Sequence, residues 1–179
     1  DQGYALTLDG IGVDEAFITL YATITGEEPI PNWGGEEETG PAVWPLNLRA
    51  EGRELEAWGA QTEWERLDSH AIKLTQRCPV MTVLPAVVEL EVYTDQLVPR
   101  VRGNWSLDLL VDKTAPDGES LVAEPNQTFT VDGQRITVEK VAVAPSGGGL
   151  VLSTKSDRPF THFILRDDQG TVLPHSYYG

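Results

Sequence analysis

The stretch YALTLDGIGVDEAFITLYATITG, residues 4–26, decides the fold class. Within residues 6–9, apolar and polar side chains alternate, which is the two-residue period of a β-strand buried on one face only. Residues 17–25 follow as FITLYATIT, a run of the β-branched and aromatic residues that strands favour. The opening of the chain therefore predicts two consecutive β-strands and an all-β protein.

The same strand pattern continues outward from this opening. Further alternating runs occupy residues 71–76, 87–93, 105–111, 128–131, 136–143 and 160–166. Glu51-Gly52 lies between two such runs and fits a hairpin turn, and Asp132-Gly133 is the strongest short hairpin signal in the chain. One helix competes with this interpretation over residues 53–67, but its apolar residues fit a helical stripe only loosely and Gly59 interrupts it.

A weak internal repeat relates the two ends of the chain at an offset of 130 residues. Leu6-Thr7-Leu8-Asp9 aligns with Ile136-Thr137-Val138-Glu139. Later aligned pairs are Ile11 with Val141, Val13 with Val143, Leu20 with Leu150, and Ala22 with Leu152. Chance matches between alternating patterns are common, so duplication and coincidence both stay open, but the repeat favours two β-domains over one.

Residues 113–126, KTAPDGESLVAEPN, have no strong period and contain two prolines, so we predict a linker there. The expected domains are residues 1–115, a β-sandwich of about seven strands and the usual size of an immunoglobulin-like domain, and residues 116–179. With only four or five expected strands, the second immunoglobulin-like domain is short or incomplete. We expect its open edge to be a contact site for strand addition.

Composition excludes several classes of protein. The 179 residues include 28 acidic and 13 basic ones, a formal charge of −15, which argues against nucleic acid and anionic membrane surfaces as partners. No apolar run is long enough to span a bilayer, and a single cysteine excludes internal disulfides and cysteine-based zinc sites. The start at Asp1 and the composition indicate a processed piece of an exported bacterial protein.

Catalytic signatures are missing from the sequence, so we expect neither an enzyme, a cofactor nor a metal site. No serine lies in a nucleophile elbow, and His70, His162 and His175 lack the spacing of metal ligands. Cys78 is a possible nucleophile beside Arg77, but a small, half-buried apolar role at a strand end is favoured.

Three tryptophans form the candidate interaction surface: Trp33, Trp44 and Trp58. Trp33 lies in the acidic segment EEPIPNWGGEEETG, residues 27–40, and loops of this length are either functional or mobile. Such aromatic residues fit a sugar-stacking platform or a protein contact. The competing and favoured interpretation is an acidic loop whose tryptophan rests on the sandwich.

The opening stretch resembles the start of the ectodomain in a family of Gram-positive bacterial membrane proteins of unknown function. The residues that carry the resemblance are Gly3, Leu6, Thr7, Leu8, Asp14, Leu20, Tyr21 and Ile24. Residues 103–112 are similar to the closing strand of that domain, and residues 126–152 are similar to the immunoglobulin-like domain that often follows it. Residues 29–76 match poorly, and the second domain ends earlier than in the family.

The resemblance implies a non-enzymatic module on the extracellular face of the bacterial membrane, tethered by an N-terminal helix outside this sequence. Some members of the family resemble anti-sigma factors, so the implied role is sensing or interaction within a membrane-anchored regulator, with a protein or a cell-wall component as partner. The alternatives are a secreted or wall-associated carbohydrate-binding or adhesion module and, last, an enzyme. The sequence leaves the ligand and the oligomeric state open.

Overall fold

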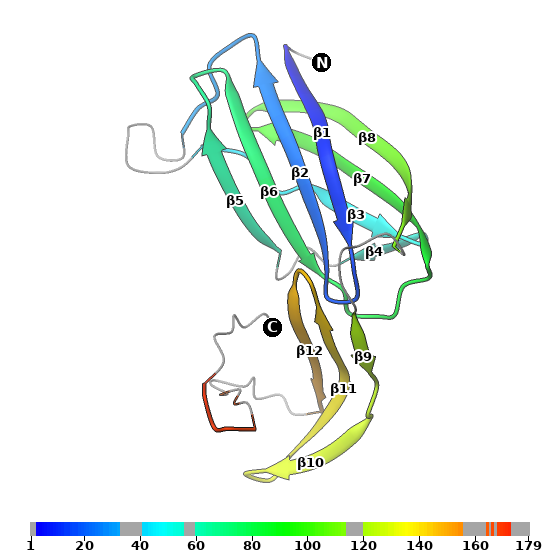
Figure 1. Ribbon diagram of the computed structural model, residues 1–179. Coiled ribbons are helices and arrows are strands. Elements are labelled where there is room, and N and C mark those ends of the chain that lie inside the picture. The colour runs from blue at the N-terminus through cyan, green and yellow to red at the C-terminus, as the bar shows by residue number, and fades with distance from the viewer. Residues whose placement is uncertain are drawn as a thin grey trace.

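Figure 1 presents the computed structural model, which describes residues 3–32, 41–55, 60–113, 120–155, 164, 166 and 168–172. All regular structure in these residues is β-structure, in three antiparallel sheets of four strands each, so the expected all-β class is confirmed. The described residues include no helix long and apolar enough to cross a membrane. The finer expectation of two immunoglobulin-like sandwiches in tandem stays a prediction.

The strands follow one another along the chain with short connections inside each hairpin. The first sheet has the order β1-β2-β6-β5 and consists of β1 (Tyr4–Val13), β2 (Phe17–Gly26), β6 (Ala71–Pro79) and β5 (Gln61–Arg66). The second has the order β4-β3-β7-β8 and consists of β4 (Arg53–Leu55), β3 (Asn47–Ala50), β7 (Val87–Val98) and β8 (Val101–Asp112). The third consists of β10 (Gln127–Val131), β11 (Gln134–Ala144), β12 (Gly147–Thr154) and β9 (Leu121–Ala123), with β11 pairing with each of the others.

The first and second sheets share one hydrophobic core. Alternate residues of β2 and β6 point into it, and the opposing side chains come from β3 and β7 and the segments beside them. The largest apolar side chains that are fully buried there are Ile18, Leu20, Ile24, Leu46, Leu48, Ile72, Leu74, Val88, Leu97 and Val98. Burial of these alternating residues is the main force that holds the two sheets together.

A β-bulge explains an irregularity in the opening alternation. The pairing of β1 with β2 shifts between Leu8 and Gly10, so Asp9 is an extra residue in the ladder. Leu6 and Leu8 pack against the core before the bulge, and Ile11 packs against the same core after it. The bulge therefore shifts the alternation by one position and keeps the apolar side chains on one face.

The repeat at an offset of 130 residues extends to the strand pairing. Leu8 pairs with Ala22 and Val138 pairs with Leu152, and in each hairpin the register shifts immediately afterwards. After the shift, Gly10 pairs with Tyr21 and Lys140 pairs with Val151. The hairpin β11–β12 thus reproduces the register and the bulge of the hairpin β1–β2.

Both predicted hairpin turns are confirmed. Glu51 and Gly52 connect β3 to β4 with φ values of 50° and 71°, and Asp132 and Gly133 connect β10 to β11 with 48° and 79°. Two successive positive φ values match the right-handed twist of the flanking strands and are tolerated by glycine. The competing helix over residues 53–67 is wrong, because β4 and β5 occupy the described part of it.

The predicted linker is only partly correct. Of residues 113–126, Leu121–Ala123 form β9, which pairs with β11 as an outer strand of the third sheet. A short apolar run with prolines nearby gives too weak a period to identify a three-residue strand from sequence.

Gln76 joins the first sheet to the second through the core. Its side chain is fully buried, accepts a hydrogen bond from the backbone N–H of Leu46 at 2.7 Å, and donates one to the C=O of Leu46 at 2.7 Å. The amide also donates to the sulfur of Cys78 at 3.3 Å. Because every polar atom of the amide has a partner, this buried glutamine stabilises the pairing of the sheets.

We predict that Gln76→Met lowers the free energy of unfolding by about 2–5 kcal/mol, since it leaves the N–H and C=O of Leu46 buried without partners. Urea unfolding followed by tryptophan fluorescence measures this loss. The matched control is Leu74→Met in the same strand and core, which conserves volume and is expected to cost less than about 1.5 kcal/mol. Equal losses for the two variants would show that the hydrogen bonds of Gln76 contribute nothing.

Candidate interaction site

Of the three tryptophans predicted as an interaction surface, the structure describes Trp44. Its side chain is 43% exposed just before β3, and its backbone N–H donates to the C=O of Leu97 at 3.1 Å. Trp33 and Trp58 lie outside the described residues. The sugar-stacking hypothesis therefore has one exposed ring in place and stays a prediction.

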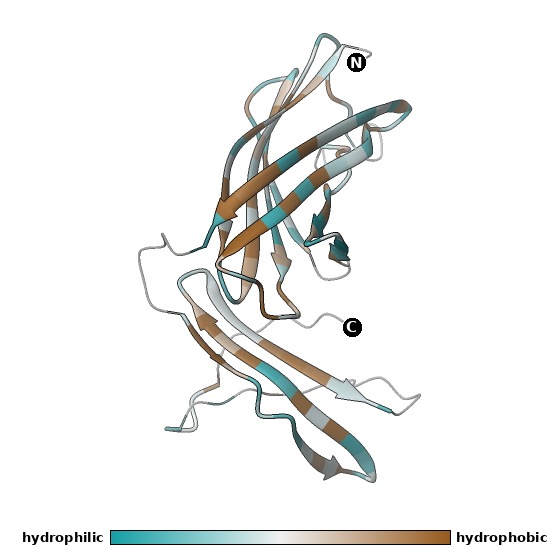
Figure 2. Ribbon diagram, turned by 90° about the vertical axis from the view of Figure 1, so that its right-hand side faces the viewer, coloured by the Kyte–Doolittle hydropathy of each residue, from teal (hydrophilic) through white to brown (hydrophobic). Residues whose placement is uncertain are grey.

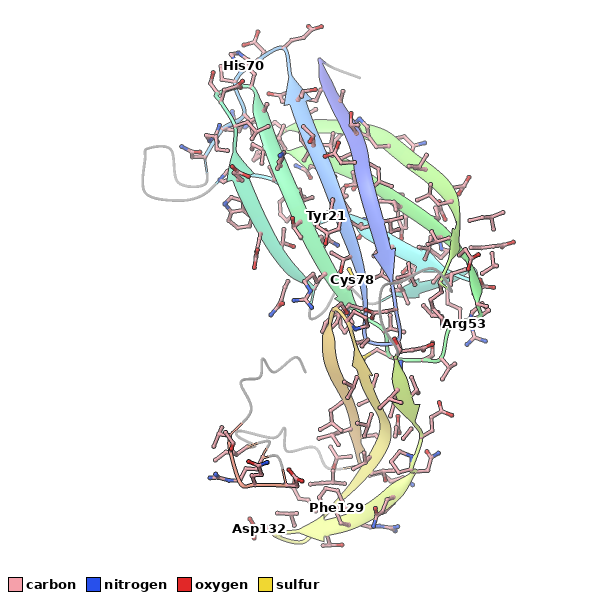
Figure 3. All side chains as sticks on the ribbon, in the orientation of Figure 1. Tyr21, Arg53, His70, Cys78, Phe129 and Asp132 are labelled. Atoms are coloured by element: carbon pink, nitrogen blue, oxygen red, sulfur yellow. The ribbon has the colours of Figure 1, made fainter. Side chains whose placement is uncertain are left out.

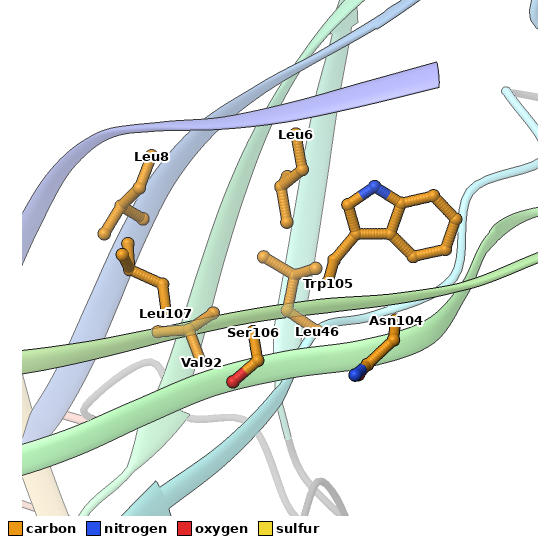
Figure 4. A pocket seen from close by; sticks show the side chains of 8 residues that line it. All are labelled: Leu6, Leu8, Leu46, Val92, Asn104, Trp105, Ser106 and Leu107. Carbon is orange, nitrogen blue, oxygen red and sulfur yellow. The ribbon is translucent and has the colours of Figure 1, made fainter. Parts of the chain in front are cut away.

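An apolar cleft opens between the edge strands β1 and β8 (Figure 4). It has a volume of about 260 Å³ and is lined by Leu6, Leu8, Leu46, Val92, Asn104, Trp105, Ser106 and Leu107. The half-buried ring of Trp105 packs over Gly103, where an added Cβ would lie 2.4 Å from the ring. The lining holds no ionisable side chain, so the cleft offers space for an apolar group beside the amide of Asn104 and the hydroxyl of Ser106.

Cys78 lies in the core rather than at a reactive site. Its side chain is 3% exposed in β6, and burial raises the pKa of its thiol despite the hydrogen bond from Gln76. A buried thiol with a raised pKa is a poor nucleophile. Among the residues that the structure describes, no group of three or more His, Cys, Asp or Glu side chains is arranged to hold a metal ion.

The third sheet is joined to the first by the ammonium group of Lys140. This side chain follows the bulge in β11 and is only 2% exposed. Its Nζ donates to the C=O of Glu15 at 2.8 Å, Val80 at 2.9 Å and Thr82 at 3.2 Å. Burial lowers the pKa of Lys140, although the nearby carboxylate of Glu15 acts in the opposite direction. All three ammonium protons are used, which is how a buried charge becomes tolerable.

Asp14 supports the same junction from the turn between β1 and β2. Its carboxylate accepts hydrogen bonds from the backbone N–H of Ala16 and of Phe17, both at 2.9 Å, and from the N–H of Ser146 at 3.1 Å. Burial alone raises the pKa of Asp14, but the hydrogen bonds from Ser146, Phe17 and Ala16 outweigh it and lower the pKa. One carboxylate thus shapes the turn and binds the tip of the β11–β12 hairpin.

Two further cations lie beside the junction, and one of them contacts the third sheet. Lys113 donates to the carboxylate of Glu15 at 2.5 Å and to the C=O of Leu84 at 2.7 Å. The guanidinium of Arg77 lies 4.5 Å from the centre of the Phe17 ring and donates to the C=O of Ser146. The contact of Arg77 with Ser146 joins the first sheet to the tip of the β11–β12 hairpin, whereas Lys113 joins the β1–β2 turn to the connection before β7.

The third sheet has an apolar face, which we define as Leu121, Phe129, Val131, Ile136, Val141 and Val143. The pairs Phe129 with Ile136 and Leu121 with Val143 lie on one side of the sheet, because directly opposed residues in an antiparallel pair share a face. Figure 2 shows apolar residues recurring along these strands. The exposed fractions are 69% for Leu121, 56% for Val143, 48% for Val131, 42% for Phe129 and 36% for Val141, whereas Ile136 is 6% exposed.

This apolar face was partly visible in the sequence. The alternation in residues 136–143 predicted its strand and the identity of its apolar side chains. The exposure of those side chains was not predicted, because an alternating pattern is equally typical of a strand whose face is covered. Lys140 was missed because one lysine in an alternating strand reads as solvent-exposed.

Comparison of the chain with protein-family models, with curated proteins and with solved structures finds no match. The resemblance to an ectodomain family therefore stays a prediction that rests on the residues quoted above.

We predict that the free energy of unfolding decreases at acidic pH, in part because Asp14 becomes protonated. Because its pKa is lowered in the folded protein, its stabilisation is fully present above the ordinary aspartate value near 3.9 and is lost as the pH falls through the lower folded value. Asp14→Asn removes this part of the pH dependence below about pH 4. Denaturant unfolding at a series of pH values measures the slope.

The control for this experiment is Asp108→Asn on β8, where the carboxylate is exposed. It is expected to keep the slope of the natural sequence. An unchanged slope in Asp14→Asn would contradict the assignment of Asp14 to the junction.

Proposed function

We propose that this chain is a non-enzymatic interaction module on the extracellular face of a bacterial membrane, part of a membrane-anchored regulatory protein similar to anti-sigma factors. It is built, in this proposal, from two immunoglobulin-like β-domains that act through contacts with another protein. The observation that carries the proposal is the apolar face of the third sheet, with Leu121 and Val143 more than half exposed.

Exposed apolar residues that lie together are typical of protein contact sites, because burying them against a partner is favourable and leaving them in water is not. The apolar face combines an aromatic ring, Phe129, with leucine and valine side chains, and an apolar centre that includes aromatic residues is typical of protein interfaces. Phe129 lies toward the end of the third sheet remote from the first sheet, as Figure 3 shows, where a partner has access to it.

The junction supports a regulatory role for such a contact. Lys140 and Asp14 tie β11 and its hairpin tip to the turn between β1 and β2 through buried hydrogen bonds. In this proposal, a contact on the third sheet acts on the first sheet through these hydrogen bonds. The proposal uses this connection to link partner binding to the rest of the regulator.

The stretches that carry the family resemblance form defined parts of the structure. Residues 3–24 include β1 and most of β2, residues 103–112 belong to the edge strand β8, and residues 126–152 include β10 and β11. They thus supply both copies of the repeated hairpin and an edge of the second sheet. This placement supports the proposed domain order.

Site-specific photo-cross-linking in the native cells tests the proposal. A photoreactive residue replaces Val143, which is 56% exposed on the apolar face, in the full-length protein. The matched control replaces Tyr21, which is 48% exposed on the outer face of β2. We expect a protein adduct in the membrane fraction from position 143 and none from position 21.

No protein adduct from position 143, or equal adducts from both positions, would contradict the proposed function. An adduct with cell-wall saccharide instead would support the alternative of a wall-associated binding module.

A further inference from the structure

We propose that the apolar face of the third sheet is a homodimer interface, in which two copies of the chain pack these faces against each other. The inference rests on the proposed function, which assigns the apolar face to a protein contact, and it names the partner as a second copy of this chain. The dimer would build between two chains the kind of two-sheet core that the first and second sheets build within one.

The argument begins with the repeated hairpin. Because β11–β12 has the register and bulge of β1–β2 displaced by 130 residues, each inward-facing residue of β1 has a counterpart in β11. The counterparts of Leu6, Ile11 and Val13, which pack against the core, are Ile136, Val141 and Val143. The apolar face is therefore the equivalent of a core-facing surface.

The two copies of the hairpin differ in what covers this surface. The second sheet covers it in the first copy, where Val13 is 7% exposed. In the second copy the counterpart Val143 is 56% exposed, and Val141 is 36% exposed. The third counterpart, Ile136, is 6% exposed, so within the described residues the surface stands open at Val141 and Val143 of β11 and at Leu121, Phe129 and Val131 of the neighbouring strands.

The second sheet, which covers the hairpin β1–β2, indicates what kind of surface would cover the hairpin β11–β12. It is an antiparallel sheet of four strands that presents alternating apolar side chains. Within the described residues all three sheets have four strands, and the third presents an apolar face of which five of the six members are at least 36% exposed. A second copy supplies such a sheet through a two-fold axis, the commonest symmetry of oligomers, in which one patch serves on both sides.

Charge favours this pairing over contact through other surfaces. Residues 120–155 contain three acidic and three basic residues and carry no net formal charge, whereas residues 1–113 contain 20 acidic and 8 basic residues. Two copies therefore repel each other through their first parts and meet without net repulsion at the third sheet. Lys140 does not disturb the interface, because its ammonium is buried at the junction with the first sheet.

Sedimentation velocity of the purified chain between about 1 and 100 μM tests the inference. We expect a concentration-dependent dimer and at least tenfold weaker association for Val143→Lys and for Phe129→Lys, each checked for folding by circular dichroism. Both side chains are exposed in the single chain, so the substitutions leave its core intact. The matched control Tyr21→Lys, on the outer face of β2, is expected to dimerise like the natural sequence.

A monomer at 100 μM, or dimers that Val143→Lys and Phe129→Lys leave unchanged, would overturn the inference. Hydrogen exchange of a monomer would then show whether residues after 155 cover the apolar face. The proposed function is tested by a different experiment: it is contradicted when cross-linking from position 143 yields no protein adduct, whatever the sedimentation result. A monomer whose position 143 cross-links to a different protein overturns the homodimer and keeps the interaction module.

Discussion

The ammonium group of Lys140 is the constraint on which the arrangement of the molecule depends. A charge that is 2% exposed is costly unless each of its protons finds an acceptor, and the acceptors here are three carbonyls at one end of the first sheet. Those carbonyls belong to Glu15, Val80 and Thr82, on two separate connections. Three hydrogen bonds from Lys140 to these connections therefore hold the third sheet in place on the first.

The same constraint decides which face of the third sheet stays available. Lys140 and Ala142, both buried, lie on the side of β11 opposite Val141 and Val143. Docking through the lysine therefore turns the apolar residues away from the first sheet. The proposal of an interaction module uses this geometry, in which one face of the sheet is used for attachment and the apolar face points away from the first sheet.

Local sequence patterns predicted the strands and turns, because both depend on neighbouring residues. The alternation in residues 6–9 and the turns at Glu51-Gly52 and Asp132-Gly133 needed no knowledge of the rest of the chain. The repeat could be predicted too, since its two copies share their apolar positions. Strands were favoured over a helix at residues 53–67 as well, because the apolar residues there fit a helical stripe only loosely.

The polar contacts could not be predicted, because their partners are far away in the sequence. Gln76 bonds Leu46 across the core, and Asp14 bonds Ser146 from 132 residues away. Neither residue differs in type from the polar residues around it, and only the packed sheets bring the partners together. The sequence singled out large aromatic residues as the candidate interaction surface. The contacts between the third and first sheets are made instead by Lys140, Asp14 and backbone groups.

Unfolding of Lys140→Met, followed by two probes, tests the role of this lysine most directly. All five tryptophans precede residue 113, as do the strands of the first two sheets, so their fluorescence follows that part of the chain, whereas far-ultraviolet circular dichroism reports on all three sheets. We predict coincident urea transitions for the natural sequence and for the exposed control Lys155→Met. In Lys140→Met the dichroism should fall at lower urea than the fluorescence, with about 2–4 kcal/mol lost from the third sheet. Coincident transitions at an unchanged midpoint in Lys140→Met would contradict the account.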